Sequence, residues 1–258
     1  MAINLSKNLE KGQTIDLRKN DKGEDIYDLS SVTVGLGWDV REEKKDFFGK
    51  LFSSKKEEDF DLDAIAFLLD SNGYVTNLGK EIQLSNGQRR TLQGSDIIFF
   101  NNMTFPSGSG TSKMLYPEGT PKSVMEQKVR NLLNAGELIV HTGDNLTGEG
   151  EGDDEQIIVK LNSLPTRIHK ILFLVCIYQG QRKNQHFGQV DNAFIRICDT
   201  KGKEIARYSL SNNPEFNGMC SMIFGEVYRH NGVWKFRALG NPEQTDNFIE
   251  ILKRYIKH

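Results

Sequence analysis

Short runs of β-branched and aromatic residues alternate with turn residues along most of the chain, which is typical of a protein built from strands. About ten such runs stand out: Val32–Trp38, Phe60–Leu69, Asp96–Phe100, Leu138–His141, Gln156–Leu161, Ile171–Tyr178, Ala193–Cys198, Glu204–Leu210, Ser221–Arg229 and Val233–Leu239. Asn231-Gly232 predicts a type I′ hairpin turn, because both residues tolerate positive φ angles. About ten strands without alternating helices predict an all-β sandwich of mostly antiparallel strands.

Two segments interrupt this pattern with helical spacing of apolar residues. Pro121 opens the first, and Gly136 is placed to end it. The second is a C-terminal helix near 242–257, with Pro242 in its first turn. We expect both helices to pack on the sandwich, and a partner-binding face is the alternative.

The chain is long enough for one large all-β domain, and we expect residues 1–258 to form a single β-sandwich. Three polar segments, near 41–58, 77–94 and 103–137, interrupt it and are predicted to be surface insertions. The first also carries apolar residues, including Phe47, so that a transient contact with a membrane or a protein stays open.

The overall charge excludes some classes of partner. A formal net charge of −2 gives no positive field to attract nucleic acid or anionic lipid. Three cysteines without a CxxC pair argue against a disulfide framework or a zinc site, and each lies in an apolar run, so we expect buried, reduced thiols. The chain shows neither a signal-peptide core nor an apolar stretch of membrane-spanning length, which predicts a cytoplasmic protein with no integral membrane segment.

The candidate chemistry is concentrated in one acidic run. Between Asp144 and Glu155, six of twelve residues are carboxylates, three are glycines, and none is lysine or arginine. So much negative charge in a short loop is costly unless the loop stays in water or meets a cation. Calcium binds six to eight hard oxygen ligands from carboxylates, amides and backbone carbonyls, all of which this loop offers.

A second acidic element precedes a predicted strand. Asp59, Asp61 and Asp63 alternate with Phe60 and Leu62, so the three carboxylates are expected on one face of the strand. Asp39 would face the same cluster if its strand formed a hairpin with this one around the insertion at 41–58. Ala64 stands where an EF-hand loop needs glycine, which rejects that motif.

Several motifs in fixed order resemble the TerD family of tellurium-resistance and stress proteins. They are Val32–Asp39 (VTVGLGWD), Asp59–Ala64 (DFDLDA) with Ala66–Leu69, Phe100–Asn102, His141–Asn145 (HTGDN), Gly152–Gln156 (GDDEQ), Phe187–Val190 with Asn192–Arg196, and Met222–Glu226 with Tyr228–Gly232. The resemblance implies a β-sandwich that binds Ca²⁺, two ions, in bacteria that resist tellurite, phage and chemical stress. The ligands that it implies are Asp39, Asp59, Asp61, Asp63, Asn101, Asn102, Asp144, Asn145, Glu149, Asp153, Asp154 and Glu155. Glu151 departs from the family pattern, where aspartate is more frequent.

We therefore predict a calcium-binding stress-response protein without catalytic activity, with other Ter-type proteins as candidate partners in a complex. One alternative is a metal-dependent hydrolase that uses the same acidic cluster, with His141 as the general base. A second is direct tellurite chemistry at the thiols, which buried cysteines disfavour. A third, compatible with calcium binding, is a scaffold component of a membrane-associated stress complex.

Overall fold

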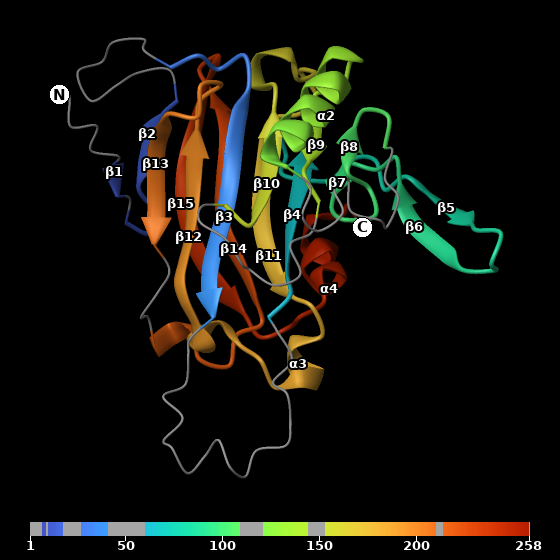
Figure 1. Ribbon diagram of the computed structural model, residues 1–258, viewed down its shortest axis with the longest axis vertical. Helices are drawn as coiled ribbons and strands as arrows, with labels where there is room; N and C mark the ends of the chain where they lie inside the picture. The colour runs from blue at the N-terminus through green and yellow to red at the C-terminus, as the bar shows by residue number, and fades with distance from the viewer. Residues whose placement is uncertain are drawn as a thin grey trace.

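Two β-sheets stacked face to face form the body of the protein (Figure 1). The computed structural model describes residues 7–8, 10–17, 27–40, 60–108, 121–143, 153–209 and 214–257. One sheet has seven strands, the other has six, and a separate two-stranded hairpin projects from the sandwich. The predicted all-β sandwich is confirmed, with more strands than the ten runs of the sequence because short edge strands complete each sheet.

The seven-stranded sheet contains the strands that flank the acidic run. Its order is β1 (Lys7–Asn8), β13 (Glu204–Ser209), β12 (Val190–Cys198), β3 (Val32–Val40), β10 (Glu155–Val159), β9 (Ile139–His141) and β8 (Thr104–Phe105). The β1–β13 pair is parallel, and the other pairs are antiparallel.

The six-stranded sheet is antiparallel throughout its described pairs. Its order is β2 (Thr14–Asp16), β15 (Val233–Glu243), β14 (Ser221–His230), β11 (Lys170–Ile177), β4 (Leu62–Leu69) and β7 (Ile97–Ile98). Asn231 and Gly232, between β14 and β15, have φ angles of 50° and 75°, which confirms the predicted type I′ turn.

Alternation along the strands builds the core between the sheets. Val32, Val34 and Leu36 of β3 point into it, whereas the residues between them point to the outer face. On β4, Leu62 and Ala64 likewise enter this core, while Ile65 lies on the outer face of the six-stranded sheet.

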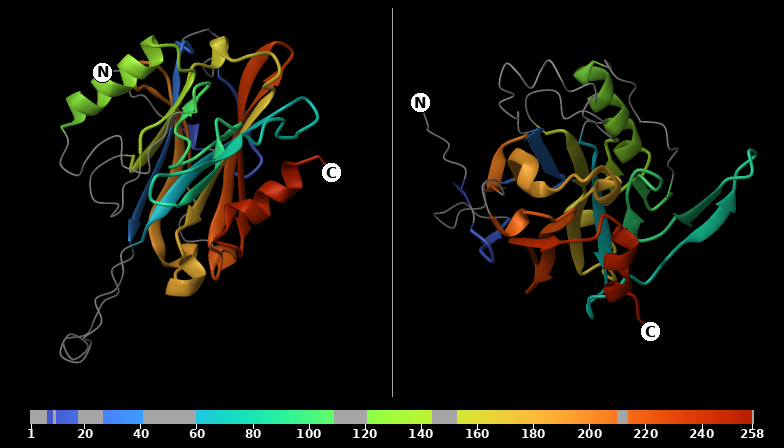
Figure 2. Two further views of the ribbon diagram at one scale, coloured as in Figure 1. Left: turned by 90° about the vertical axis from the view of Figure 1, so that its right-hand side faces the viewer. Right: turned by 90° about the horizontal axis from the view of Figure 1, so that it is seen from below.

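One helix covers part of each outer face, and Figure 2 shows the two helices on opposite sides of the sandwich. The predicted inserted helix is α2 (Lys122–Asn134), which packs its apolar residues on β9 and β10. The predicted C-terminal helix is α4 (Phe248–Leu252), followed by the 3-10 turn Lys253–Tyr255, and it packs on the six-stranded sheet. The other short helical elements are α3 (Gly180–Lys183), Leu161–Ser163, Phe187–Gln189 and Pro214–Phe216.

The predicted start of the C-terminal helix is wrong. Pro242 does not lie in the first turn of the C-terminal helix but in β15, opposite Met222 of β14. The neighbouring strand β2 pairs with β15 only at residues 235–237, so the missing N–H of Pro242 costs no hydrogen bond to β2. Asn247 caps the helix instead, accepting a hydrogen bond from the Ile249 N–H. The predicted surface insertion near 77–94 contains the hairpin of β5 (Lys80–Gln83) and β6 (Arg89–Gln93).

The strand before the 41–58 insertion does not form a hairpin with the strand after it. β3 lies between β12 and β10 in one sheet, and β4 lies between β11 and β7 in the other. The chain therefore passes from one sheet to the other between Val40 and Phe60. Residues 41–59, which include the whole 41–58 insertion, lie outside the described residues. Within the described ranges, the helices are too short or too polar to cross a membrane.

Candidate metal centre

The predicted ligands divide into those that the structure describes and those that it does not. Asp59, Asp144, Asn145 and Glu149 lie outside the described residues, and Asp39 is described for its backbone alone. The remaining seven are Asp61, Asp63, Asn101, Asn102, Asp153, Asp154 and Glu155, and they lie in several different environments.

Acidic residues gather at one end of three neighbouring strands, β12, β3 and β10. The register places Asp191 of β12 directly opposite Asp39 of β3. On the other side of β3, the Asp154 N–H donates to the Leu36 carbonyl at 2.9 Å, and the Asp154 carboxylate accepts from the Trp38 N–H at 2.9 Å. The loop with the remaining acids of the run, 144–152, joins β9 to this end of β10. Like charges directly opposite each other destabilise an antiparallel pair, and a cation bound between them would offset that cost.

Asp153 is held on the outer face of the seven-stranded sheet. Its Oδ1 accepts from the Arg196 Nε at 2.6 Å, its Oδ2 accepts from the Gln156 Nε2 at 3.0 Å, and its side chain is 2% exposed. Gly35 makes room for it, because a Cβ at residue 35 would lie 2.2 Å from the Asp153 Cγ. The two nearest donors of this carboxylate are therefore side chains of the protein.

Glu155 points the other way, into the core. Its register partner on β3 is Leu36, which is a core residue, and Glu155 is 1% exposed. Its Oε2 accepts from the Ala64 N–H of β4 at 2.6 Å. The His141 Nε2 lies 2.9 Å from the carbonyl oxygen of the same Ala64. β7 pairs with β4 only at Ala66 and Phe67. Glu155 and His141 therefore bond the backbone of β4 at Ala64, just past the end of β7.

His141 is neutral in this position. The Gly143 N–H donates to its Nδ1 at 3.0 Å, so the imidazole proton lies on Nε2 and is donated to Ala64. Burial lowers the pKa of His141 to about 4, and the hydrogen bond to Ala64 opposes this only in part. The Glu155 Oε2 is 3.6 Å from Nε2, yet desolvation outweighs its attraction for a proton. A side chain that is 1% exposed and already bonded at both nitrogens is a structural histidine, which argues against a general base.

Asp63 belongs to the other sheet and to its outer face. It lies opposite Cys176 of β11, and Cys176 packs with Ile251 of α4, whereas the neighbours of Asp63 in the chain, Leu62 and Ala64, face the core. Asp63 and Asp153 thus lie on opposite outer faces of the sandwich. Asp61 lies just before β4, where its carbonyl oxygen accepts from the Tyr178 N–H at 2.7 Å.

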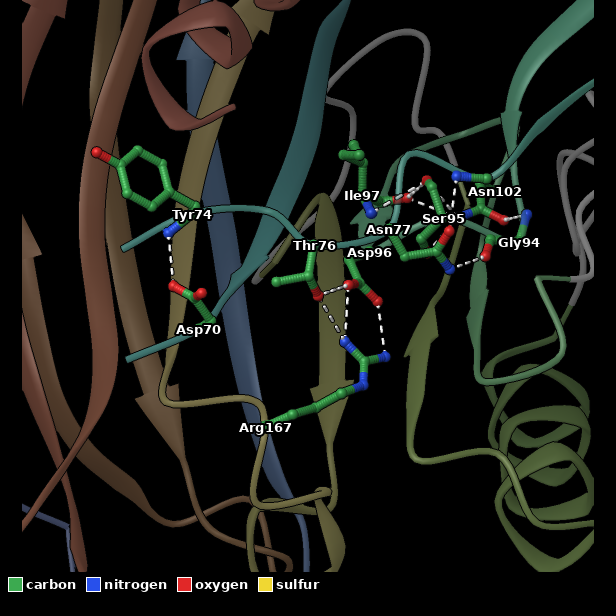
Figure 3. Close-up of polar contacts among 11 residues, drawn as sticks. Asp70, Tyr74, Thr76, Asn77, Gly94, Ser95, Asp96, Ile97, Asn102 and Arg167 are labelled. Atoms are coloured by element: carbon green, nitrogen blue, oxygen red, sulfur yellow. Dashed lines mark hydrogen bonds and ion pairs between the residues drawn. The ribbon is translucent and has the colours of Figure 1, made fainter. Parts of the chain in front are cut away.

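Asn102 is bonded within its own segment rather than to the acidic run. Figure 3 shows its amide between Ser95, Ile97 and Gly94: Nδ2 donates to the Ile97 carbonyl at 2.6 Å, and Oδ1 accepts from the Gly94 N–H at 3.0 Å. The neighbouring Asn101 differs, because its buried Oδ1 has no hydrogen-bond partner among the residues that the structure describes. An amide oxygen in that state is a suitable ligand for water or a hard cation.

This donor set fits calcium in part. Carboxylates on three adjacent strands and an amide oxygen without a partner are the ligand types that the ion prefers. Asp153 and Glu155, however, are bonded to the protein itself, and within the described part of the chain no three His, Cys, Asp or Glu side chains form a complete ion site. An ion site at this end of the sheet therefore needs Asp39, Asp191 or the loop 144–152.

Comparison with known proteins decides the family. The TerD domain model matches residues 5–82 and 129–255. The chain belongs to the TerD family. It is 46% identical over 252 residues to the tellurium resistance protein TerX of Serratia marcescens, covering 98% of this chain and 100% of that one. It is also 36% identical over 237 residues to general stress protein 16U of Bacillus subtilis strain 168, covering 92% of this chain and 90% of that one. A crystal structure of a protein of unknown function shares the fold, with a TM-score of 0.52 at 17% identity, covering 89% of this chain and 98% of that one.

The predicted membership of this tellurium-resistance and stress-response family is therefore confirmed. The family model omits residues 83–128, which include β6, β7, β8 and the first half of α2. Much of the predicted 103–137 insertion thus lies outside the region shared with the TerD model.

The cysteines of this TerD-family chain are free and buried, as the sequence predicts. Burial raises the pKa of the Cys198 thiol to about 11, and it raises the pKa of Cys176 and of Cys220 as well. Thiols that stay protonated at neutral pH are poor nucleophiles, which argues against direct tellurite chemistry.

Sequence reasoning assigned no role to two residues at this end of the sheet, Asp191 and Arg196. Asp191 precedes a bulge in β12, and Asn192 there has a φ of 52°. Arg196 stands in a motif that carries the TerD resemblance, but its partner Asp153 is 43 residues away. An acid at a predicted strand end is a usable signal, whereas the strand pairing that brings it to Asp39 cannot be inferred from the sequence.

Proposed function

We propose that this TerD-family chain is a cytoplasmic stress-response protein that binds Ca²⁺ at the acidic end of β12, β3 and β10, without catalysis. The register of Asp39 opposite Asp191, next to the acidic run, carries this proposal. Asp39 and Asp191 at a directly opposed position, together with Asp154 and the three acids of residues 144–152, would repel one another, and a divalent ion would offset that cost. The names of the relatives, tellurium resistance protein and general stress protein, support the cellular role.

The ligands in this proposal are Asp39, Asp191, Asp154 and acids of the loop 144–152. Asp154 would hold the ion beside β3, since its backbone and carboxylate are fixed to Leu36 and Trp38. Asp59 and Asp61 stay predicted ligands, since Asp61 directly precedes β4. A glycine-containing segment with several carboxylates suits calcium better than magnesium, which demands a tighter octahedron.

A calorimetric titration of metal-free protein with calcium and then with magnesium tests the site. We expect Asp191→Asn and Asp154→Asn each to weaken calcium binding by about tenfold or more, on the order of 1.4 kcal/mol, because each removes a charged oxygen. Asp63→Asn is the matched control on the opposite face, and it should change the affinity by less than about twofold. In metal-free protein, Asp191→Asn should be neutral or slightly stabilising, because it relieves repulsion with Asp39.

The proposal would be contradicted if wild-type protein showed no heat of calcium binding and if chelator left its melting temperature unchanged. Equal destabilisation by Asp191→Asn with calcium and with chelator would instead indicate an internal hydrogen-bond role for that residue.

A further inference from the structure

The carboxylate of Asp153 sits in a place built for it, although it belongs to the acidic run. Both oxygens accept hydrogen bonds from side chains, one from Arg196 and one from Gln156, at 2.6 and 3.0 Å. The floor beneath it is Gly35, and any side chain there would occupy the same space as the carboxylate. The side chain of Asp153 is 2% exposed, so the contact with Arg196 is largely shielded from water.

Arg196 is itself fixed on the outer face of the sheet. Its Nη1 lies 3.4 Å from the Glu204 Oε2, and Glu204 is held in turn by Arg207 at 2.9 Å. The Arg196 guanidinium lies 5.9 Å from the centre of the Phe194 ring. Burial works against its charge, yet the hydrogen bond and the charge of Asp153 raise the pKa of Arg196 above its usual value. A permanent positive charge thus stands beside the acidic run.

We propose that Arg196 is a built-in competitor of the calcium ion, which neutralises Asp153, holds its carboxylate on the outer face and thereby limits calcium affinity. This inference rests on the proposed function. Asp153 and Asp154 are adjacent in the chain but have different donors: a guanidinium for Asp153, and a backbone N–H of β3 for Asp154. Calcium can recruit Asp153 only by breaking two side-chain hydrogen bonds, one of them charge-assisted. The Arg196 guanidinium therefore neutralises Asp153 in place of a metal ion, while the Asp154 carboxylate stays available to calcium.

A double-mutant cycle in calcium affinity tests this competition. Metal-free wild-type protein, Arg196→Gln, Asp153→Asn and the double variant are titrated with calcium, with Arg207→Gln as the control. Arg207 lies on the same face and binds Glu204 but not Asp153, so it reports the long-range effect of removing one positive charge. We expect Arg196→Gln to bind calcium at least about fivefold more tightly than Arg207→Gln, because Asp153 becomes available as a ligand.

Asp153→Asn alone should change the affinity by less than about twofold, and it should cancel the gain of Arg196→Gln in the double variant. Arg196→Lys keeps the charge but loses the planar fork, and it covers the case in which Arg196→Gln fails to fold: it should bind calcium more tightly than wild type, by less than Arg196→Gln. Melting curves in chelator give a second readout, since Arg196→Gln should lower the melting temperature and calcium should restore it more than for wild type.

Equal affinities of Arg196→Gln and Arg207→Gln, or a tenfold loss for Asp153→Asn in the wild-type background, would overturn the inference while wild-type calcium binding stands. Wild-type protein that binds no calcium would overturn the proposed function itself, and this inference with it.

Discussion

The acidic segments 61–63 and 153–155 look alike in the sequence, but the fold treats them differently. Asp63 lies on the outer face of the six-stranded sheet, half-buried near Cys176 and α4. The side chains of Asp153 and Glu155 are buried on either side of the other sheet, one bonded to Arg196 and the other to the backbone of β4. The difference shows that carboxylate spacing alone does not define an ion site, because strands distant in the sequence supply some carboxylates with donors of their own.

The largest effect on stability is expected for Glu155, which connects the two sheets through its hydrogen bond to Ala64. Glu155→Ala should lower the free energy of unfolding by about 4 kcal/mol, because it leaves the Ala64 N–H without its acceptor and opens a cavity in the core. Urea denaturation in chelator and in calcium measures this cost, which should be the same in both conditions. Glu155→Gln keeps an acceptor oxygen and serves as the control, with an expected cost of about 1–2 kcal/mol. A loss confined to the calcium-loaded protein would mean that Glu155 is a calcium ligand instead.

The pH dependence of stability tests the neutral state of His141, the partner of Glu155 at Ala64. Its pKa is about 4 in the folded protein against 6.5 for the free side chain, so the unfolded chain binds more protons between these values. Stability should therefore fall as the pH is lowered from about 6.5 towards 4, by about 3 kcal/mol in total. Denaturation of metal-free protein across this range measures the slope, and His141→Asn should flatten it. A wild-type profile without a slope in this window would show that folding does not lower the pKa of His141.

The smallest expected effect belongs to the other acidic segment. Asp63→Asn should change the free energy of unfolding by no more than about 0.5 kcal/mol, because the side chain is only half-buried and asparagine keeps most of its hydrogen-bonding capacity. Thermal melts in chelator measure this. A cost close to that of Glu155→Ala would contradict the comparison, since it would give Asp63 a buried structural role as well.

Local patterns in the sequence were sufficient for the strands, because a strand with one face in the core needs alternating residues wherever it lies. The runs at Val32–Trp38 and Ile171–Tyr178 match β3 and β11 closely, and the prediction for α2 from Pro121 to Gly136 is confirmed. The order of the motifs was sufficient for the TerD family as well. Pro242 was misplaced because a proline suits both the first turn of a helix and an unpaired strand edge, and only the pairing of β15 distinguishes the two.

Composition and periodicity by themselves determined that this protein is an all-β sandwich with free, buried cysteines and an acidic run, since each of these follows from residue type and local spacing. Only the tertiary structure decided what each acid contacts. The β12–β3 register places the backbone of Asp191 opposite that of Asp39. Arg196 reaches Asp153 across Gly35, and Glu155 reaches Ala64 in the opposite sheet, 91 residues away. The physical reason is that the energy of a carboxylate depends on the charges and donors within a few ångströms, and in a sandwich those neighbours come from strands that are remote in the chain.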